Sequence, residues 1–313
     1  MMNTPHHDFC YALVASPAFD RDRTLFCGKE SGLYRSVDGG ATWEDAFASL
    51  ELQSTLSTTA VAISPSFLQD GQVFAGAPGG ILISTDRGVH WEIVPLTAPS
   101  PVVSELVFSP DFAADGILFA GTVEDGVYRS DDRGKSWARW NFSLIDLNVL
   151  SLAVSPDFQR DRTLFAGTET GLFISYNGGL GWEETGFPHQ YAPINYLAIS
   201  PTFAQDGYLL TGVESRGILS SHDRGRSWEP FDLNTGEATV VHLAITRGAG
   251  KRLELLAAFS SGILASRDSG KTWKTWPVSA PFPDDVAVLC APLGFNDGAS
   301  LWVGCLNGVV VRI

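Results

Sequence analysis

The chain has 313 residues, of which 44% are hydrophobic, and its formal net charge is -14 at pH 7. An acidic chain repels phosphate groups, so nucleic acids and anionic membrane surfaces are not expected partners. No stretch approaches the roughly 20 apolar residues of a membrane span, and the first residues lack the basic segment of a signal peptide. We therefore expect a cytoplasmic protein without membrane insertion, whose Cys10, Cys27, Cys290 and Cys305 are free buried thiols.

An eight-residue motif, which we call the octet, occurs six times along the chain and ends each time with a tryptophan. The copies are Ser36–Trp43, Ser84–Trp91, Ser130–Trp137, Ser175–Trp182, Ser221–Trp228 and Ser266–Trp273. Their tryptophans lie 45 to 48 residues apart. A fixed period of this length indicates one supersecondary unit copied around or along a core. Because the repeats continue without a linker, residues 1–313 are predicted to form a single domain of units of about 45 residues.

Each unit shows the same elements in the same order, and the fourth unit shows them most clearly. Its apolar runs are Leu150–Val154, Thr163–Ala166 and Leu172–Ser175, a turn-rich loop follows the first, and Trp182 opens a fourth run. Four short runs bounded by turn residues predict a four-stranded antiparallel blade of a β-propeller. First strands are predicted seven times, near Ala12, Val61, Leu106, Leu152, Leu197, Leu243 and Val288. The predicted fold is an all-β, seven-bladed β-propeller.

The seventh unit contains fewer elements than the others. It has a second strand over Leu301–Gly304 and a third over Val309–Ile313, with no octet after them. A blade that ends there leaves an unpaired edge, which folded proteins usually cover. We therefore predict that roughly Asn3–Phe9 supplies the outer strand of the seventh blade and closes the ring.

The octet itself is predicted to form a structural turn. Its third residue accepts hydrogen bonds from backbone N–H groups a few residues on, and its tryptophan packs across the hairpin. The acceptor positions are Asp38, Asp86, Asp132, Asn177, Asp223 and Asp268, and the tryptophans are Trp43, Trp91, Trp137, Trp182, Trp228 and Trp273. One carboxylate per octet does not supply the converging oxygens of a metal site, so neither a metal nor another cofactor is predicted.

The octets resemble the Asp-box (BNR) repeat, Ser/Thr-x-Asp-x-Gly-x-Thr/Ser-Trp. The chain resembles the seven-bladed photosystem II assembly factors most closely in size and blade count, and the same repeat occurs in sialidases and in xyloglucanase-type glycosidases. In this family the box is a turn away from the ligand face. Sialidases clamp their substrate with an arginine triad that begins in an Arg-Ile-Pro motif, and this chain has no such motif. The assembly factors use an arginine patch, and none is evident from this sequence. The resemblance thus favours a protein that is not an enzyme.

Three sets of residues are candidates for a binding face made by the turns between second and third strands and by the blade-to-blade connections. Polar residues expected at the channel mouth are Glu105, Ser151, Tyr196 and His242, where the other units have Ala12, Ala60 and Ala287. Acidic residues of the turns are Glu30, Glu124, Asp125, Glu169 and Glu214. Apolar residues expected to be exposed on the connections include Phe142, Phe187, Tyr191, Trp276 and Phe282.

These candidates support a non-catalytic propeller that binds a protein or peptide, because aromatic residues on loops above a rigid scaffold are typical of protein interfaces. An acidic ring would speed the association of a basic partner. Two alternatives remain. The first alternative is a glycan-binding or glycoside-hydrolysing protein, because a carboxylate, a phenol and an imidazole suffice for acid–base chemistry. The other is a subunit of a larger enzyme complex. The channel residues can also be wet hydrogen-bonding groups, and the loop aromatics can also cap blade cores.

Overall fold

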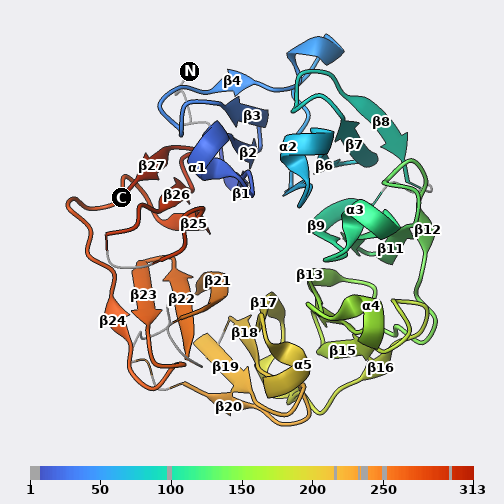
Figure 1. The fold of residues 1–313 in the computed structure, drawn as a ribbon, viewed down its shortest axis with the longest axis vertical. Helices are drawn as coiled ribbons and strands as arrows, with labels where there is room; N and C mark the ends of the chain where they lie inside the picture. The colour runs from blue at the N-terminus through green and yellow to red at the C-terminus, as the bar shows by residue number, and fades with distance from the viewer. Residues whose placement is uncertain are drawn as a thin grey trace, which may run out of the picture.

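The computed structural model describes residues 8–96, 101–214, 217–231, 233, 239–248, 252–295 and 298–313. Within them, seven antiparallel sheets stand in a ring around a central channel, with strands ordered from the inside outward (Figure 1). A cavity of about 500 Å³ in the channel is lined by the first strands of the first five blades. The predicted seven-bladed β-propeller is confirmed.

The first four blades each contain four strands in simple sequence order. Their strands are β1 (Cys10–Ala15), β2 (Leu25–Lys29), β3 (Gly32–Ser36) and β4 (Glu44–Asp45); β5 (Ala60–Ile63), β6 (Val73–Ala77), β7 (Gly80–Ser84) and β8 (Glu92–Pro95); β9 (Val102–Phe108), β10 (Leu118–Val123), β11 (Gly126–Ser130) and β12 (Ala138–Arg139); and β13 (Val149–Val154), β14 (Leu164–Thr168), β15 (Leu172–Ser175) and β16 (Glu183–Glu184).

The last three blades continue this order, but only three strands of the seventh lie among the described residues. Their strands are β17 (Ile194–Ile199), β18 (Leu209–Val213), β19 (Gly217–Ser221) and β20 (Glu229–Pro230); β21 (Val240–Arg247), β22 (Leu253–Phe259), β23 (Gly262–Ser266) and β24 (Lys274–Thr275); and β25 (Val286–Cys290), β26 (Trp302–Cys305) and β27 (Val310–Arg312). All seven predicted first strands lie in β1, β5, β9, β13, β17, β21 and β25.

A one-turn helix follows the first strand in each of the first five blades, where the sequence predicted only a loop. The helices are α1 (Phe19–Asp22), α2 (Phe67–Asp70), α3 (Phe112–Asp115), α4 (Phe158–Asp161) and α5 (Phe203–Asp206). In α1 the Ser16 hydroxyl donates to the Asp22 carboxylate at 2.6 Å, and Phe19 is buried. Two single 3₁₀ turns, Ala48–Leu50 and His189–Tyr191, lie in blade-to-blade connections.

Glycines in the second strands allow neighbouring blades to approach one another. A Cβ on Gly76 would lie 2.6 Å from the Val103 Cβ of the next blade. The same crowding recurs between Gly167 and Ile194 at 2.6 Å, and between Gly304 and Cys10 at 2.8 Å across the junction of the last and first blades. Because protein interiors are close-packed, a side chain at these positions would push the blades apart.

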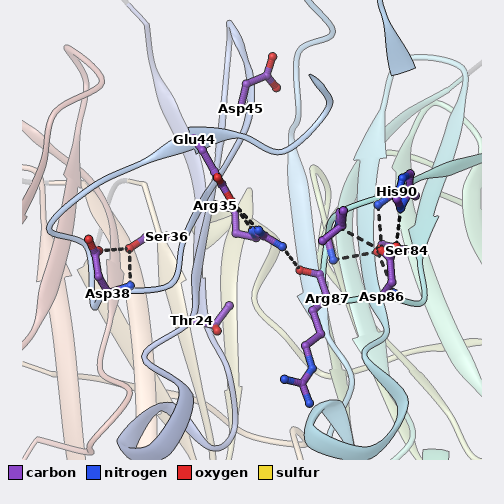
Figure 2. A network of polar contacts seen from close by, with 12 residues as sticks. Thr24, Arg35, Ser36, Asp38, Glu44, Asp45, Ser84, Asp86, Arg87 and His90 are labelled. Atoms are coloured by element: carbon purple, nitrogen blue, oxygen red, sulfur yellow. Dashed lines mark hydrogen bonds and ion pairs between the residues drawn. The ribbon is translucent and has the colours of Figure 1, made fainter. Parts of the chain in front are cut away.

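Each Asp-box forms the turn that the sequence predicted. In the first box the Ser36 hydroxyl donates to the Asp38 carboxylate at 2.8 Å (Figure 2). The same hydroxyl accepts from the Gly40 N–H at 2.8 Å, and the Asp38 carboxylate also accepts from the Thr42 N–H at 3.0 Å. Asn177 accepts from the Ser175 hydroxyl at 2.9 Å in the fourth box, so the turn needs the oxygen and not the charge. Arg35 donates to the Arg87 carbonyl at 2.8 Å and thereby joins the first blade to the second box.

The seventh blade has no strand on the outer side of β27 among the described residues. The predicted closing segment lies mostly outside these residues, and its described members Asp8 and Phe9 are not in a strand. Lys29 lies 3.8 Å from the Asp8 carboxylate and donates to the Gly308 carbonyl at 2.7 Å, which places Asp8 beside the turn that leads into β27. Residues 3–7 are therefore within reach of that edge, and closure by this segment stays a prediction.

Substitution of Gly76 by Ala is expected to lower the free energy of unfolding by about 1–3 kcal/mol, because the new methyl group would overlap Val103. Urea unfolding measures the change. Gly262→Ala is the matched control, since Gly262 is also in a strand and a Cβ there meets nothing within 4 Å. Equal stability of the two variants would show that close blade packing does not require this glycine.

Deletion of residues 1–7 is expected to lower the melting temperature by several degrees, because a partner strand of β27 would be lost and about 1 kcal/mol corresponds to a few degrees in a domain of this size. Differential scanning calorimetry of the full chain and of the shortened chain makes the comparison. An unchanged melting temperature would contradict closure by the N-terminal segment.

Candidate functional site

The channel positions predicted from sequence occupy one equivalent register in six of the seven blades. Ala12, Ala60, Glu105, Ser151 and Tyr196 each lie opposite a glycine of the second strand, and His242 lies opposite Ala258. In the seventh blade Val288 is the equivalent residue, because it lies opposite Gly304 and Ala287 falls at the irregularity in the pairing. The prediction of Ala287 is thus one residue out of register.

Glu105, Tyr196 and His242 are half-buried at these channel positions. The rings of Tyr196 and His242 meet edge to face with centroids 6.4 Å apart. Burial raises the pKa of Glu105 to about 7 and lowers the pKa of His242 to about 4. Burial, followed by the charge of Glu105, raises the pKa of Tyr196 to about 12, so the carboxyl and the phenol act on each other. The predicted group therefore converges in the channel, while the buried Ser151 donates to the Ile194 carbonyl at 3.1 Å.

This channel group is poorly equipped for glycoside hydrolysis. Most glycosidases need two carboxyl groups about 5–9.5 Å apart, one as acid and one as nucleophile or base. Glu105 is the only carboxylic acid at the seven channel positions. At neutral pH the His242 imidazole is neutral and Glu105 is close to half ionised. The channel can thus hydrogen-bond a polar group, but its seven positions offer no second carboxyl for the reaction.

The acidic residues lie on the face made by the turns between second and third strands, which we call the turn face. Glu30, Glu124, Glu169 and Glu214 are exposed there. Asp125 differs, because its carboxylate pairs with Arg139 at 2.9 Å and accepts a short hydrogen bond from Tyr128. The turn face therefore carries four exposed carboxylates, one on each of four blades.

The predicted interface aromatics divide into exposed and buried residues. Phe142 is 76% exposed, whereas Phe187 and Trp276 are only 4% and 7% exposed. Phe187 meets Trp228 edge to face at 5.4 Å, and Tyr191 packs against the same apolar cluster. Phe282 packs with Trp276 in another cluster. The expectation of exposure is wrong for Phe187 and Trp276, which cap blade cores.

Two exposed apolar residues beside Phe142 were not predicted. Tyr176 and Leu180, both in the fourth Asp-box, are 51% and 55% exposed. Phe142 and Tyr176 line one cavity of about 240 Å³, and Phe142 pairs with Gly181 next to Leu180. We call Phe142, Tyr176 and Leu180 the Phe142 patch. The signal was present in the sequence, since most other boxes carry charged or small residues at these two positions.

The face that carries the helices and the Asp-boxes, which we call the box face, holds arginines over the helical phenylalanines. Each guanidinium lies 5.4–6.0 Å from a ring centroid, in the pairs Arg23–Phe19, Arg87–Phe67, Arg133–Phe112, Arg162–Phe158 and Arg224–Phe203. At this distance the cation is attracted to the ring face. The sequence analysis found no arginine patch because these arginines come from two different positions of the repeat.

Within the described residues no group of three His, Cys, Asp or Glu side chains could hold a metal ion. The four cysteines are free, with Cys290 half-buried and the other three buried. None of the described helices is long and apolar enough to cross a membrane. The cytoplasmic location stays a prediction.

The ring of blades, the six boxes and their hydrogen bonds define a seven-bladed Asp-box β-propeller. A family model described as photosynthesis system II assembly factor YCF48 matches residues 11–141, which span most of the first three blades. A comparison with curated proteins found no match. The fold and this match agree with the resemblance to the seven-bladed assembly factors.

Solved structures share the fold at low sequence identity. YCF48 bound to D1 peptide has a TM-score of 0.70 and 19% identity, over 99% of this chain and 93% of that chain. YCF48 from Cyanidioschyzon merolae has a TM-score of 0.70 and 16% identity, over 99% and 97%. An ancestral GH74 enzyme has a TM-score of 0.74 and 17% identity, but the chain spans only 45% of its length.

Substitution of Glu105 by Gln is expected to flatten the pH dependence of stability between about pH 4.5 and pH 7. The folded chain holds a proton on Glu105 up to a pKa of about 7, whereas its ordinary value is 4.5, so stability falls as pH rises through this window. Urea unfolding at pH 5 and pH 8 measures the fall in both proteins. His242 titrates in both and its contribution cancels; an equal fall would contradict the buried acid.

Proposed function

We propose that this protein is a non-catalytic propeller that binds a protein or peptide partner through the Phe142 patch. The exposure of this patch is the observation that carries the proposal. Monomeric proteins rarely leave neighbouring large apolar side chains in water without a binding role. Aromatic residues in a patch of this kind are typical of the centres of protein interfaces.

The surroundings of the patch suit a binding surface. The connection that carries Phe142 is anchored by Leu144, which is buried, while Ile145 is 75% exposed. The Trp182 N–H donates to the Phe142 carbonyl at 2.9 Å, which fixes the loop against the fourth blade. A fixed loop loses little conformational entropy on binding, so more of the contact energy becomes affinity.

Two further observations support a protein or peptide partner. The described turn face adds exposed Glu30, Glu124, Glu169 and Glu214, which would steer a basic partner toward the molecule. One structurally similar protein is YCF48 bound to D1 peptide. A glycan ligand has weaker support, because the GH74 likeness concerns the fold and the channel offers one carboxyl group.

The double variant Phe142→Ser and Leu180→Ser is expected to lose the partner. The tagged wild-type chain captures the partner from native lysate, the partner is then purified, and its Kd is measured by calorimetry. We expect at least a tenfold weaker Kd for the double variant, about 1.4 kcal/mol, because the apolar anchors are removed.

Val37→Ser with Val89→Ser is the matched control, since these exposed valines are 56% and 45% exposed in the first two boxes. The control should bind as wild type does. Equal affinity of all three proteins would contradict the proposed surface. Turnover of a glycoside that Glu105→Gln abolishes would contradict the non-catalytic assignment.

A further inference from the structure

At five blade junctions, which we call sealed, the tryptophan of one Asp-box covers the outer part of the preceding blade. Trp91 meets Phe47 at 5.2 Å, Trp228 meets Phe187 at 5.4 Å and Trp273 meets Phe231 at 5.6 Å, each edge to face. At the third junction the Trp182 indole donates to the Trp140 carbonyl at 2.8 Å. At the junction between the second and third blades, Trp137 packs against the apolar cluster that contains Leu96. A tryptophan thus closes each junction from the first blade to the sixth.

Among the described residues, no box tryptophan covers the junction between the sixth and seventh blades. Trp276 follows β24 in the place that Phe231 takes after β20, since their N–H groups donate to Ile263 and Ile218 of the respective third strands. No Asp-box follows β27 among the residues that the structure describes. The cluster of Trp276 contains no box tryptophan; Phe282 and Phe295 pack in it instead, and Trp276 is 7% exposed.

A groove occupies the position of the missing tryptophan. It has a volume of about 780 Å³, against about 230 Å³ and 240 Å³ for cavities beside the boxes of the second and fourth blades. Ala265, Trp276, Pro277 and Ile313 form its apolar wall. The lining of the groove extends from the outer strand β24 to the end of β27. Figure 1 places both strands toward the outside of the ring.

The charged lining of the groove is mostly cationic, although the chain has a net charge of -14. Arg252 and Lys274 are exposed, and their side chains make no hydrogen bond or ion pair with the described residues. Arg267 lies 3.1 Å from Glu254. The carboxylate of Asp268 is engaged in its own box by Thr272 at 2.7 Å. Two exposed cations therefore stand beside the groove without an ion pair to the described residues, and Asp268 is the one acidic side chain among the described lining residues.

We propose that this groove is a docking site for an acidic peptide segment of a partner protein, which inserts one aromatic side chain against the apolar wall of Trp276, Pro277 and Ile313. The aromatic ring would take the place that a box tryptophan takes at the other junctions. Acidic residues beside that ring would pair with Arg252 and Lys274. This site is separate from the Phe142 patch on the third and fourth blades, so an experiment can contradict one of the two proposed binding sites without contradicting the other.

Fluorescence anisotropy with three labelled peptides tests the site on the full chain. The first peptide carries one Trp between Asp and Glu residues, the second replaces that Trp by Ala, and the third replaces the acids by Lys. We expect the first peptide to bind saturably, the second at least tenfold more weakly, and the third not at all. Equal binding of the first two, or binding of the third, would overturn the proposal.

Variants of the chain locate the binding. Lys274→Glu and Arg252→Glu are each expected to weaken the first peptide at least fivefold, and Ala299→Trp should block it by filling the groove without lowering the melting temperature. Lys135→Glu, at a junction that is sealed, is the matched control and should bind as wild type does. Phe142→Ser should also leave binding unchanged. Weaker binding of the first peptide by the control variants, or unchanged binding by the groove variants, would overturn the proposed site.

One competing occupant lies within the chain. If residues 1–7 fill the groove themselves, the wild-type chain will not bind the first peptide and a chain that begins at residue 8 will. That result would overturn the proposal in favour of an internal occupant. Binding by both chains within a factor of three supports the partner peptide.

Discussion

The ring depends on the contact between the second strand of one blade and the first strand of the next. At Gly76, Gly167 and Gly304 this contact is so close that even a methyl group would overlap its neighbour. The last of these contacts joins the seventh blade to Cys10 in the first, so the constraint runs through the point where the ring closes. Close packing at each junction makes the blades one rigid body and gives the channel a fixed lining. The geometry of Glu105, Tyr196 and His242 follows, because three separate blades hold the three side chains at one register.

The outer parts of the blades are joined by different means. Box tryptophans cover the preceding blade, and Arg35 reaches from the first blade to the backbone of the second box. The arginines of the box face come from two different positions of the repeat, yet their guanidinium groups occupy the same place in the blade. In the second blade Arg87 of the box covers Phe67 and Gly71 ends the helix, whereas in the first blade Arg23 ends the helix and covers Phe19. Both arginines have a positive φ, and a guanidinium reaches the same place over the ring from either.

The repeat was sufficient to predict the fold, the number of blades and the role of the box, because the octet occurs six times and the first-strand pattern seven times with nearly the same residues. The register of the channel was predictable in six blades for the same reason. It failed at Ala287. The first strand of the seventh blade has the same pairing irregularity as those of five other blades, and the residue after it that lies opposite the second-strand glycine is Val288. Exposure of single aromatics was not predictable. Phe187 and Phe142 both follow an outer strand, and only the packing of Trp228 on Phe187 separates the buried residue from the exposed one.

In a ring built from copies, residues that recur are explained by the construction of the blade, and departures from the repeat require another explanation. Three departures stand out in this chain. The channel positions hold alanine in two blades but Glu105, Tyr196 and His242 in three others. The fourth box exposes Tyr176 and Leu180. At the junction of the sixth and seventh blades, no box tryptophan lies among the described residues of the cluster of Trp276. The first departure adds half-buried titratable groups, the second adds exposed apolar surface, and the third leaves a groove beside cationic groups without described partners. Such features do not stabilise the fold, and the two proposed binding sites would account for the second and the third.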